Sequence, residues 1–146
     1  MKAVFFVPGP PCGKGRPRVV QQDGESRAYT PQKTKDYEWL VALCYRAQCR
    51  PGETLTEAPV RVEITAVCPI PASASKKERR DMLEGRAWPT KKPDVDNITK
   101  IILDALSGVA YRDDKQVVQC SCAKHYGEKP GVLVGLEALS EGEEER

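Results

Sequence analysis

The sequence predicts an α+β fold, a single domain in which helices flank a mixed β-sheet. The first observation is length, because 146 residues are typical of one domain and enough to bury a core. The second is a stretch at 60–68 in which apolar and polar residues alternate, as in a half-buried strand. The third is the order of strand-like and helix-like patterns, which interleave along the chain without an internal repeat.

The first half of the chain predicts three strands and a long helix. We expect a strand at 2–7, a loop rich in glycine, proline and basic residues at 9–18, and a short hairpin at 19–29. Thr30 followed by Pro31 is typical of a helix start, with Thr30 as N-cap and the proline at the first helical position. The helix is expected to end near Gln48 and to turn one face inward, formed by Tyr37, Leu40, Val41 and Cys44.

The second half predicts two more helices and three more strands. Ser75 and Glu78 have the pattern of a capping box, which predicts a short basic helix ending near residue 83. A second helix is expected at 97–106 and is apolar enough to be well buried. The expected strands lie at 60–68, 116–125 and 132–137.

One segment, 94–114, concentrates five carboxylates around a single lysine. The acidic residues are Asp94, Asp96, Asp104, Asp113 and Asp114, and the lysine is Lys100. Carboxylates this close together repel one another unless a positive charge lies among them. Mg²⁺ is usually held by one or two carboxylates together with substrate phosphates, so the segment predicts a metal site for phosphate chemistry.

The spacing favours convergence of several of these side chains. If the backbone before the helix is extended, Asp94 and Asp96 point to the same face. Asp96 or Asn97 is then a good N-cap for the helix that follows. Lys100 and Asp104 come after Asp96 at intervals of four, which places them along one stripe of the helix.

A structural interpretation of the same residues stays open. The aspartates before the helix are then caps, and the pair at 113–114 is an ordinary solvated turn. Lys100 in that case forms an i,i+4 ion pair with Asp96 or Asp104, worth about 0.3–0.5 kcal/mol. The metal-site interpretation needs folding to bring the turn and the start of the helix together.

Three motifs fill this segment. They are Lys92-Pro93-Asp94-Val95-Asp96-Asn97-Ile98-Thr99-Lys100, Asp104-Ala105-Leu106-Ser107-Gly108 and Asp113-Asp114-Lys115-Gln116-Val117. Together they resemble the signature of the RusA family of Holliday-junction resolvases, and residues 10–18 and 29–31 resemble its phage and prophage members. The likeness covers most of residues 3–137. It implies a RusA-like fold and a homodimeric, Mg²⁺-dependent endonuclease, with Mn²⁺ able to substitute, that nicks four-way DNA junctions symmetrically.

The resemblance also implies roles for individual residues. The metal-binding and catalytic carboxylates of the family correspond to Asp94, Asp96 and Asp114, and its catalytic lysine corresponds to Lys100. Asp104 and Asp113 match the pattern as supporting residues, and Asp113 is also a candidate metal ligand. A lysine beside carboxylates stays protonated, so we expect Lys100 to stabilise negative charge developing at phosphorus rather than to act as a base.

One segment departs from the family pattern. Residues 69–93 are longer than in the most compact members, and no bulky apolar residue immediately precedes Asp94. A role of this segment in opening the junction is therefore undecided. Trp88 is the nearest aromatic residue, and the alternative for it is ordinary packing.

The charge distribution favours a nucleic-acid partner. The formal net charge is only +2, but the tail at 141–146 holds four glutamates and one arginine, so residues 1–140 carry +5. We expect residues 1–140 to form the domain and the tail to be disordered. The candidate DNA-binding residues are Lys14, Arg16, Arg18, Lys91 and Lys92, although each basic group has an ordinary solvated face as its alternative.

The loop at 9–15 is a poor match to a phosphate-binding P-loop. Three residues rather than four separate its first glycines, and Gly15 stands where a Ser or Thr would meet Mg²⁺. Pro10 and Pro11 also lack the backbone N–H groups that a phosphate cradle needs. Nucleotide hydrolysis is disfavoured, and a basic loop touching DNA or a plain connection remains.

The cysteines do not suggest a zinc site or a disulfide framework. The six cysteines lack metal-ligand spacing, and His125 is the single histidine. The apolar run before Pro8 is too short for a signal peptide, and no run approaches a transmembrane helix. We therefore expect reduced, mostly buried thiols in a cytoplasmic protein, bacterial or phage-encoded, that has no membrane partner.

The function expected from these observations is metal-assisted hydrolysis of DNA at four-way junctions by paired nicks. One alternative is a branched-DNA or flap endonuclease of broader specificity. Another is a non-catalytic DNA-binding module whose acidic residues hold a structural cation. Mg²⁺-dependent nicking of a synthetic junction separates the enzymes from the module.

Overall fold

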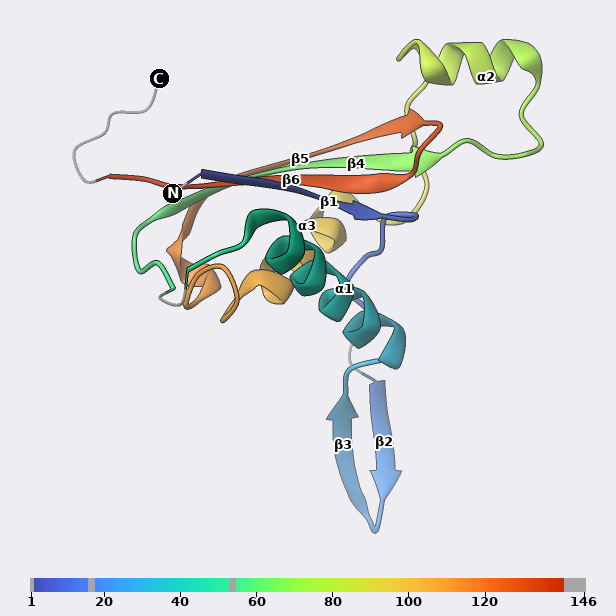
Figure 1. Ribbon diagram of the computed structural model, residues 1–146. Coiled ribbons are helices and arrows are strands. Elements are labelled where there is room, and N and C mark those ends of the chain that lie inside the picture. The colour runs from blue at the N-terminus through green and yellow to red at the C-terminus, as the bar shows by residue number, and fades with distance from the viewer. Residues whose placement is uncertain (1, 16–17, 53–54, 141–146) are drawn as a thin grey trace.

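The structure, a computed structural model, describes residues 2–15, 18–52 and 55–140 (Figure 1). Its elements are β1 Lys2–Pro8, β2 Arg18–Gln22, β3 Glu25–Tyr29, α1 Gln32–Cys49, β4 Val60–Pro69, α2 Lys76–Leu83, α3 Val95–Leu106, the 3₁₀ turn η1 Asp114–Gln116, β5 Val117–Gly127 and β6 Gly131–Ala138. This order confirms the expected sequence of strands and helices. Arg16 and the acidic tail at 141–146 lie outside the described residues.

The main sheet is mixed, which confirms the α+β class. Its strand order is β1-β6-β4-β5, with antiparallel pairs β1–β6 and β6–β4 and a parallel pair β4–β5. β4 buries every second residue from Val60 to Cys68, as the alternation predicted. A parallel pair needs a crossover connection, and α2, α3 and η1 lie within it.

Two helices cover one face of this sheet (Figure 1). α3 turns a wide apolar side toward the sheet, and its buried residues are Ile98, Ile101, Ile102, Ala105 and Leu106. α1 packs beside α3 and against β1, where the Tyr45 ring meets the Phe5 ring edge to face at 5.5 Å. Burial of α3 on the sheet therefore fixes the position of the acidic motif that it carries.

The start of α1 differs from the expectation. Pro31 itself is the N-cap, with ψ at 144°, and the first helical residue is Gln32. Thr30 as N-cap is therefore wrong, and no side chain caps this end. The Thr34 hydroxyl instead accepts a hydrogen bond from the Gly15 N–H at 3.2 Å, so the preceding loop uses the oxygen available at this helix end.

The start of α3 also differs, and this changes the predicted site. Asp94 is the N-cap, with φ −73° and ψ 154°, and Asp96 already lies in the first helical turn. The expectation of an extended stretch from Asp94 to Asp96, with Asp96 or Asn97 as N-cap, is wrong. Aspartate is a favoured N-cap, so the helix begins directly after Pro93 rather than two residues later.

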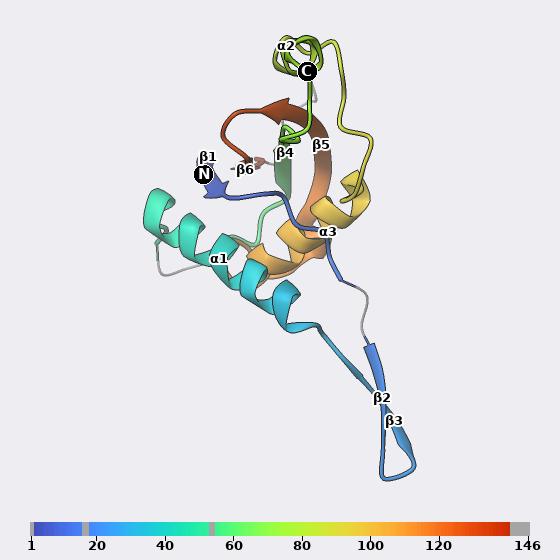
Figure 2. The same cartoon turned by 90° about the vertical axis from the view of Figure 1, so that its right-hand side faces the viewer.

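The hairpin of β2 and β3, which we call the arm (residues 18–29), forms a second sheet of its own. It projects from the body of the molecule beside the first turn of α1 (Figures 1 and 2). Asp23 and Gly24 make its turn with positive φ, 54° and 78°. The described side chains from Asp23 to Ala28 are all exposed, so no described residue of this chain covers this part of the arm.

The remaining local expectations have mixed outcomes. The capping box at Ser75 and Glu78 is confirmed, and the basic α2 that it opens buries no residue. All six cysteines are free, but only Cys44 and Cys68 are buried, and Cys120 is exposed. Within the described ranges, no helix combines the length and hydropathy that crossing a membrane requires.

Candidate active site

The N-terminal end of α3 presents two exposed carboxylates. Asp94 makes no side-chain capping bond, and Asp96 follows it in the first turn. Among the described residues, neither carboxylate has a hydrogen-bond or ion-pair partner. The positive end of the helix dipole stabilises negative charge here by about 0.3–1 kcal/mol, which partly offsets the repulsion between them.

The glycine-rich loop before the arm holds this helix end in place. The Lys14 N–H donates to the Asn97 carbonyl at 3.0 Å. A Cβ on Gly13 would lie 3.0 Å from the Pro93 Cβ and 3.1 Å from the Asn97 Cβ, so any larger residue here would press on the start of α3. The N–H groups of Gly9, Lys14 and Gly15 are thus used within the chain rather than left for a phosphate.

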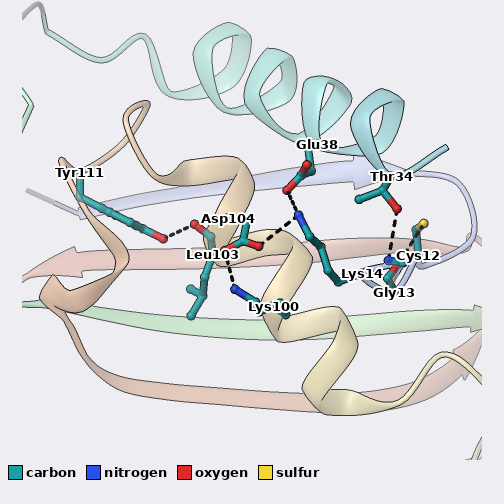
Figure 3. A network of polar contacts seen from close by, with 10 residues as sticks. Cys12, Gly13, Lys14, Thr34, Glu38, Lys100, Leu103, Asp104 and Tyr111 are labelled. Atoms are coloured by element: carbon teal, nitrogen blue, oxygen red, sulfur yellow. Dashed lines mark hydrogen bonds and ion pairs between the residues drawn. The ribbon is translucent and has the colours of Figure 1, made fainter. Parts of the chain in front are cut away.

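A charged network runs along the middle of α3 (Figure 3). Lys14 Nζ lies 3.0 Å from Glu38 Oε2 of α1 and 3.1 Å from Asp104 Oδ2 of α3. Asp104 Oδ1 lies 3.1 Å from Lys100 Nζ. The Lys14 and Asp104 side chains are only 22% and 21% exposed, whereas Lys100 is 60% exposed. One carboxylate thus joins an interior lysine to an exposed one.

The network gives Lys14 and Lys100 different environments, which the sequence alone did not reveal. Lys14 was expected to contact DNA, yet its ammonium joins α1 to α3. Burial opposes its charge, but hydrogen bonds to Glu38 and Asp104 outweigh this and raise the Lys14 pKa. Lys100 forms the i,i+4 pair that the structural interpretation allowed, and its exposure leaves it accessible to a substrate as well.

The C-terminal end of α3 carries the second acidic pair. Asp113 caps η1 by accepting a hydrogen bond from the Lys115 N–H at 2.9 Å, and this bond lowers the pKa of the Asp113 carboxyl. Asp114 is the first residue of η1 and is exposed. Asp113 therefore has a structural role, which leaves Asp114 as the freer candidate for metal binding.

A buried tyrosine fixes this second pair against the helix. Tyr111 is fully buried, and its hydroxyl donates to the Leu103 carbonyl at 2.7 Å. Burial raises the pKa of Tyr111, with the charges of Asp114 and Asp104 adding to the effect. Tyr111 therefore stays a neutral donor at physiological pH, and the turn is held to the last part of α3.

The two acidic pairs lie at opposite ends of α3. β5 starts at η1 and runs back along the helix, so Lys124 reaches the Pro93 and Lys91 carbonyls at 3.1 and 2.8 Å. The 12 residues of α3 span about 18 Å. In the described part of the chain, no three Asp, Glu, His or Cys side chains form a group able to hold a metal ion. Folding of one chain thus does not unite the turn with the helix start.

The remaining candidates lie around the start of α3. Lys91 and Lys92 are exposed just before it. Of the arginines, Arg16 is outside the described residues and Arg18 begins β2. Trp88 is 59% exposed and is therefore not a core residue, although its ring lies 5.3 Å from that of His125.

Sequence reasoning missed two positioning residues. Glu38 pairs with Lys14 across 24 positions, and no local pattern marks such a contact. The position of Lys124 was predictable from the sequence. The period of two along β5 places it on the same face as Cys122, which is the face that α3 covers.

Comparison with known proteins identifies the family. The model of the family described as endodeoxyribonuclease RusA matches residues 8–137. A protein of Bacillus subtilis (strain 168) named uncharacterized protein YqaN is 39% identical over 138 residues, which cover 93% of this chain and 96% of that protein. The family match spans the loop, the arm, both ends of α3, β4, β5 and most of β6, and it begins at the last residue of β1. The chain therefore belongs to the RusA family of endodeoxyribonucleases.

Proposed function

We propose that the protein is an Mg²⁺-dependent, homodimeric endodeoxyribonuclease that resolves four-way DNA junctions by paired symmetric nicks. The observation that carries this proposal is the exposed pair Asp94 and Asp96, which has no partner among the described residues. The pair lies within the segment that the family model matches, with Asp96 about one helical turn and Asp94 about two turns before Lys100. The buried body of α3 holds these residues rigidly. Membership of an endonuclease family supports DNA as the substrate.

The donor set suits Mg²⁺ when substrate is present. This ion usually takes one or two carboxylates from the protein and completes its shell with water and phosphate. Asp94 and Asp96 would supply those carboxylates, and Asp114 is the proposed third ligand. The bound ion lowers the pKa of a coordinated water and stabilises charge on the attacking and leaving oxygens.

The distance between Asp114 and the helix start supports a dimer. In a two-fold dimer, Asp114 of the second chain would complete the site that Asp94 and Asp96 form in the first. Two such sites related by symmetry match the two opposed strands of a junction.

Lys100 has the position expected of an electrostatic catalyst. Its Nζ is held by Asp104 but stays exposed on the side of α3 that carries Asp96. A compact ammonium there stabilises negative charge that develops at the phosphate during hydrolysis. Lys91 and Lys92, next to the same helix end, are proposed to bind the DNA backbone.

Nicking of synthetic substrates tests the proposal. The wild-type protein is incubated with a four-way junction, a fork and a linear duplex, each with Mg²⁺, with Mn²⁺ and with a chelator. We expect metal-dependent nicks at symmetric positions in two opposed junction strands, and much slower cutting of the duplex. Equal cutting of forks and flaps would favour the broader nuclease, and binding without any cutting would contradict the enzyme assignment.

A further inference from the structure

The arm is a two-stranded sheet that pairs with no other strand among the described residues. A hairpin of five residues a strand is at best marginally stable in water unless something packs on it. Both of its outer edges also present unpaired backbone groups. The arm exposes apolar side chains, with Val19 67% and Tyr29 46% exposed. These features indicate that another surface covers it.

The two faces of the arm differ in chemistry. Residues opposite each other in the hairpin share a face, so the pairs Val19–Ala28 and Gln21–Ser26 lie together. This neutral face carries no charge, and the Gln21 amide already donates to the Ser26 hydroxyl at 3.0 Å. The opposite face bears Arg27, Glu25 and Val20. The neutral face can therefore be buried at little cost in desolvation.

The charge of the arm argues against DNA as its main partner. Residues 18–29 contain two arginines and two acidic residues, so they add no net positive charge. Arg27 also lies 3.9 Å from Glu25, within the arm itself. A surface that binds phosphate backbone needs an excess of lysine and arginine. A protein surface fits the arm better.

The body offers a matching surface at the base of the arm. It is a groove of about 930 Å³ between the glycine-rich loop, the start of α1 and the residues before α3. Its lining is mainly apolar, and we call it the proline groove because it contains Pro10, Pro11, Pro31 and Pro93, with Tyr37 and Leu40. The Tyr37 hydroxyl is buried there, beside the Cys12 backbone.

The arm and the proline groove also complement each other in charge. Lys33 and Lys92 line the groove, with Asp36 as an opposing charge. The tip of the arm carries Asp23 and Glu25. The acidic tip and the uncharged face of the arm thus correspond to the two lysines and the mainly apolar lining of the groove. The arm points away from the body of the molecule (Figure 2).

We propose that the arm of one chain docks its neutral face into the proline groove of a second copy of the chain, and that the second copy does the same in return. This inference rests on the proposed homodimer and assigns its contact surface. Because Pro93 lines the groove and Asp94 follows it, the exchanged arm lies at the edge of the candidate active site. Exchange would thus link dimer formation to assembly of the site.

The first test compares two valines of similar exposure in the wild-type background. Val19→Asp places a charge on the neutral face, and Val4→Asp places one on the open face of the main sheet, where Val4 is 57% exposed. Sedimentation velocity should show that Val19→Asp raises the dimer dissociation constant at least roughly a hundredfold, since the docked face occurs twice in each dimer. Val4→Asp should leave it within about threefold. The reverse pattern overturns the proposal.

The second test does not depend on whether a variant weakens the dimer. Cys12 lines the proline groove, so Ser26→Cys creates a thiol pair that a short bis-maleimide can join. Burial raises the pKa of the Cys12 thiol, so the reaction is run at mildly alkaline pH. We expect a cross-link from Cys12 to the new thiol between chains, identified by mass spectrometry on a mixture of ¹⁵N-labelled and unlabelled protein. Cys12→Ser should remove it.

The outcomes separate this proposal from the proposed function. Interchain cross-links without any nicking of DNA would support arm exchange and contradict the enzyme assignment. Junction nicking by a protein whose cross-links form only within one chain would support the enzyme assignment and contradict arm exchange. Junction nicking together with a Val19→Asp variant that stays dimeric would do the same. If Val19→Asp stays dimeric but loses affinity for junction DNA, the arm binds DNA and the exchange is refuted.

Discussion

Two turns of α3 use the same residue type in opposite ways. Asp104, in the last part of the helix, holds Lys14 with one oxygen and Lys100 with the other and is largely buried. Asp94 and Asp96, at the first turn, are exposed and have no ion-pair or hydrogen-bond partner among the described residues. A carboxylate whose oxygens are paired stabilises the fold. An unpaired one contributes little to the fold and is available to a cation.

Function and stability therefore depend on different turns of one helix. A shared acidic motif does not imply a shared role, because the partners of each carboxylate decide what its removal costs. Removing a carboxylate from the first turn should reduce activity and change the free energy of unfolding little. Removing the Asp104 carboxylate should lower the free energy of unfolding. Substitutions that preserve shape and remove charge test this division.

The largest expected effect is on activity at the first turn. Asp96→Asn should reduce Mg²⁺-dependent nicking at least roughly a hundredfold, because an amide oxygen is a weaker ligand and carries no charge. Its free energy of unfolding should stay within about 1 kcal/mol of wild type, since lost helix-dipole stabilisation and relieved repulsion oppose each other. Single-turnover nicking and urea denaturation measure the two quantities.

Asp104→Asn is the matched control for this division. It should lower the free energy of unfolding by roughly 1–3 kcal/mol, because it weakens bonds to two lysines.

Asp94→Asn and Asp114→Asn should behave like Asp96→Asn. Normal cutting by the Asp96→Asn protein in Mg²⁺ would remove the metal assignment from this helix end.

Lys100→Ala should separate catalysis from binding. We expect its nicking rate to fall roughly a hundredfold with junction affinity within about twofold of wild type, because the charge it stabilises develops only during reaction. Lys100→Arg should rescue poorly, since guanidinium differs in shape and hydration. Stability should fall by only about 0.3–0.5 kcal/mol, the worth of an exposed i,i+4 pair.

An exposed lysine that is not among the candidate site residues provides the control for Lys100. Lys129 is exposed between β5 and β6, and Lys129→Ala should alter neither rate nor affinity. If Lys100→Ala cuts at the wild-type rate, Lys100 is only the surface partner of Asp104.

Lys14→Ala should act on stability instead. The substitution leaves Glu38 without its ammonium partner and Asp104 with only one lysine, so the free energy of unfolding should fall by roughly 1–3 kcal/mol. The control is Lys14→Met, which keeps the apolar stem and removes only the charge. A Lys14→Ala protein with wild-type stability and weakened junction binding would return Lys14 to the DNA-binding set.

The same contact predicts a pH dependence. The Lys14 pKa is raised in the folded protein, so its contribution to stability is complete below the ordinary lysine pKa of about 10.4 and is lost as pH rises through the folded value. Wild type should therefore lose more thermal stability than Lys14→Met between neutral and strongly alkaline pH. Parallel melting curves for the two proteins over that range would contradict the network.

Local patterns predicted the framework of the molecule well. Alternation along β4, the capping box of α2 and the apolar faces of α1 and α3 each involve residues a few positions apart, where periodicity is informative. The motif in α3 also identified the family correctly. Its helix start was placed two or three residues late, since Asp94, Asp96 and Asn97 are all acceptable N-caps and local sequence does not choose among them.

Long-range contacts were not predictable. Lys14 and Asp104 are 90 positions apart, so nothing local distinguishes an interior lysine from the basic residues around it. The separation of Asp114 from Asp94 likewise follows from β5 pairing parallel to β4, which sets the turn at the far end of α3. The sequence motifs identified the carboxylates of this segment, but the arrangement of the strands and helices determines which of them lie together.

The smallest expected effect concerns the lysines that remain for DNA. Lys91 and Lys92 are exposed beside the first turn of α3, unlike Lys14 in its network. Replacing both with Gln should leave stability unchanged and reduce the salt dependence of junction binding by about 0.9 in slope for each phosphate that the protein then leaves unneutralised. The matched control is Lys76→Gln with Lys77→Gln on α2, which should keep the wild-type slope. If the α2 pair lowers the slope and the Lys91 and Lys92 pair does not, the DNA path crosses α2 rather than the start of α3.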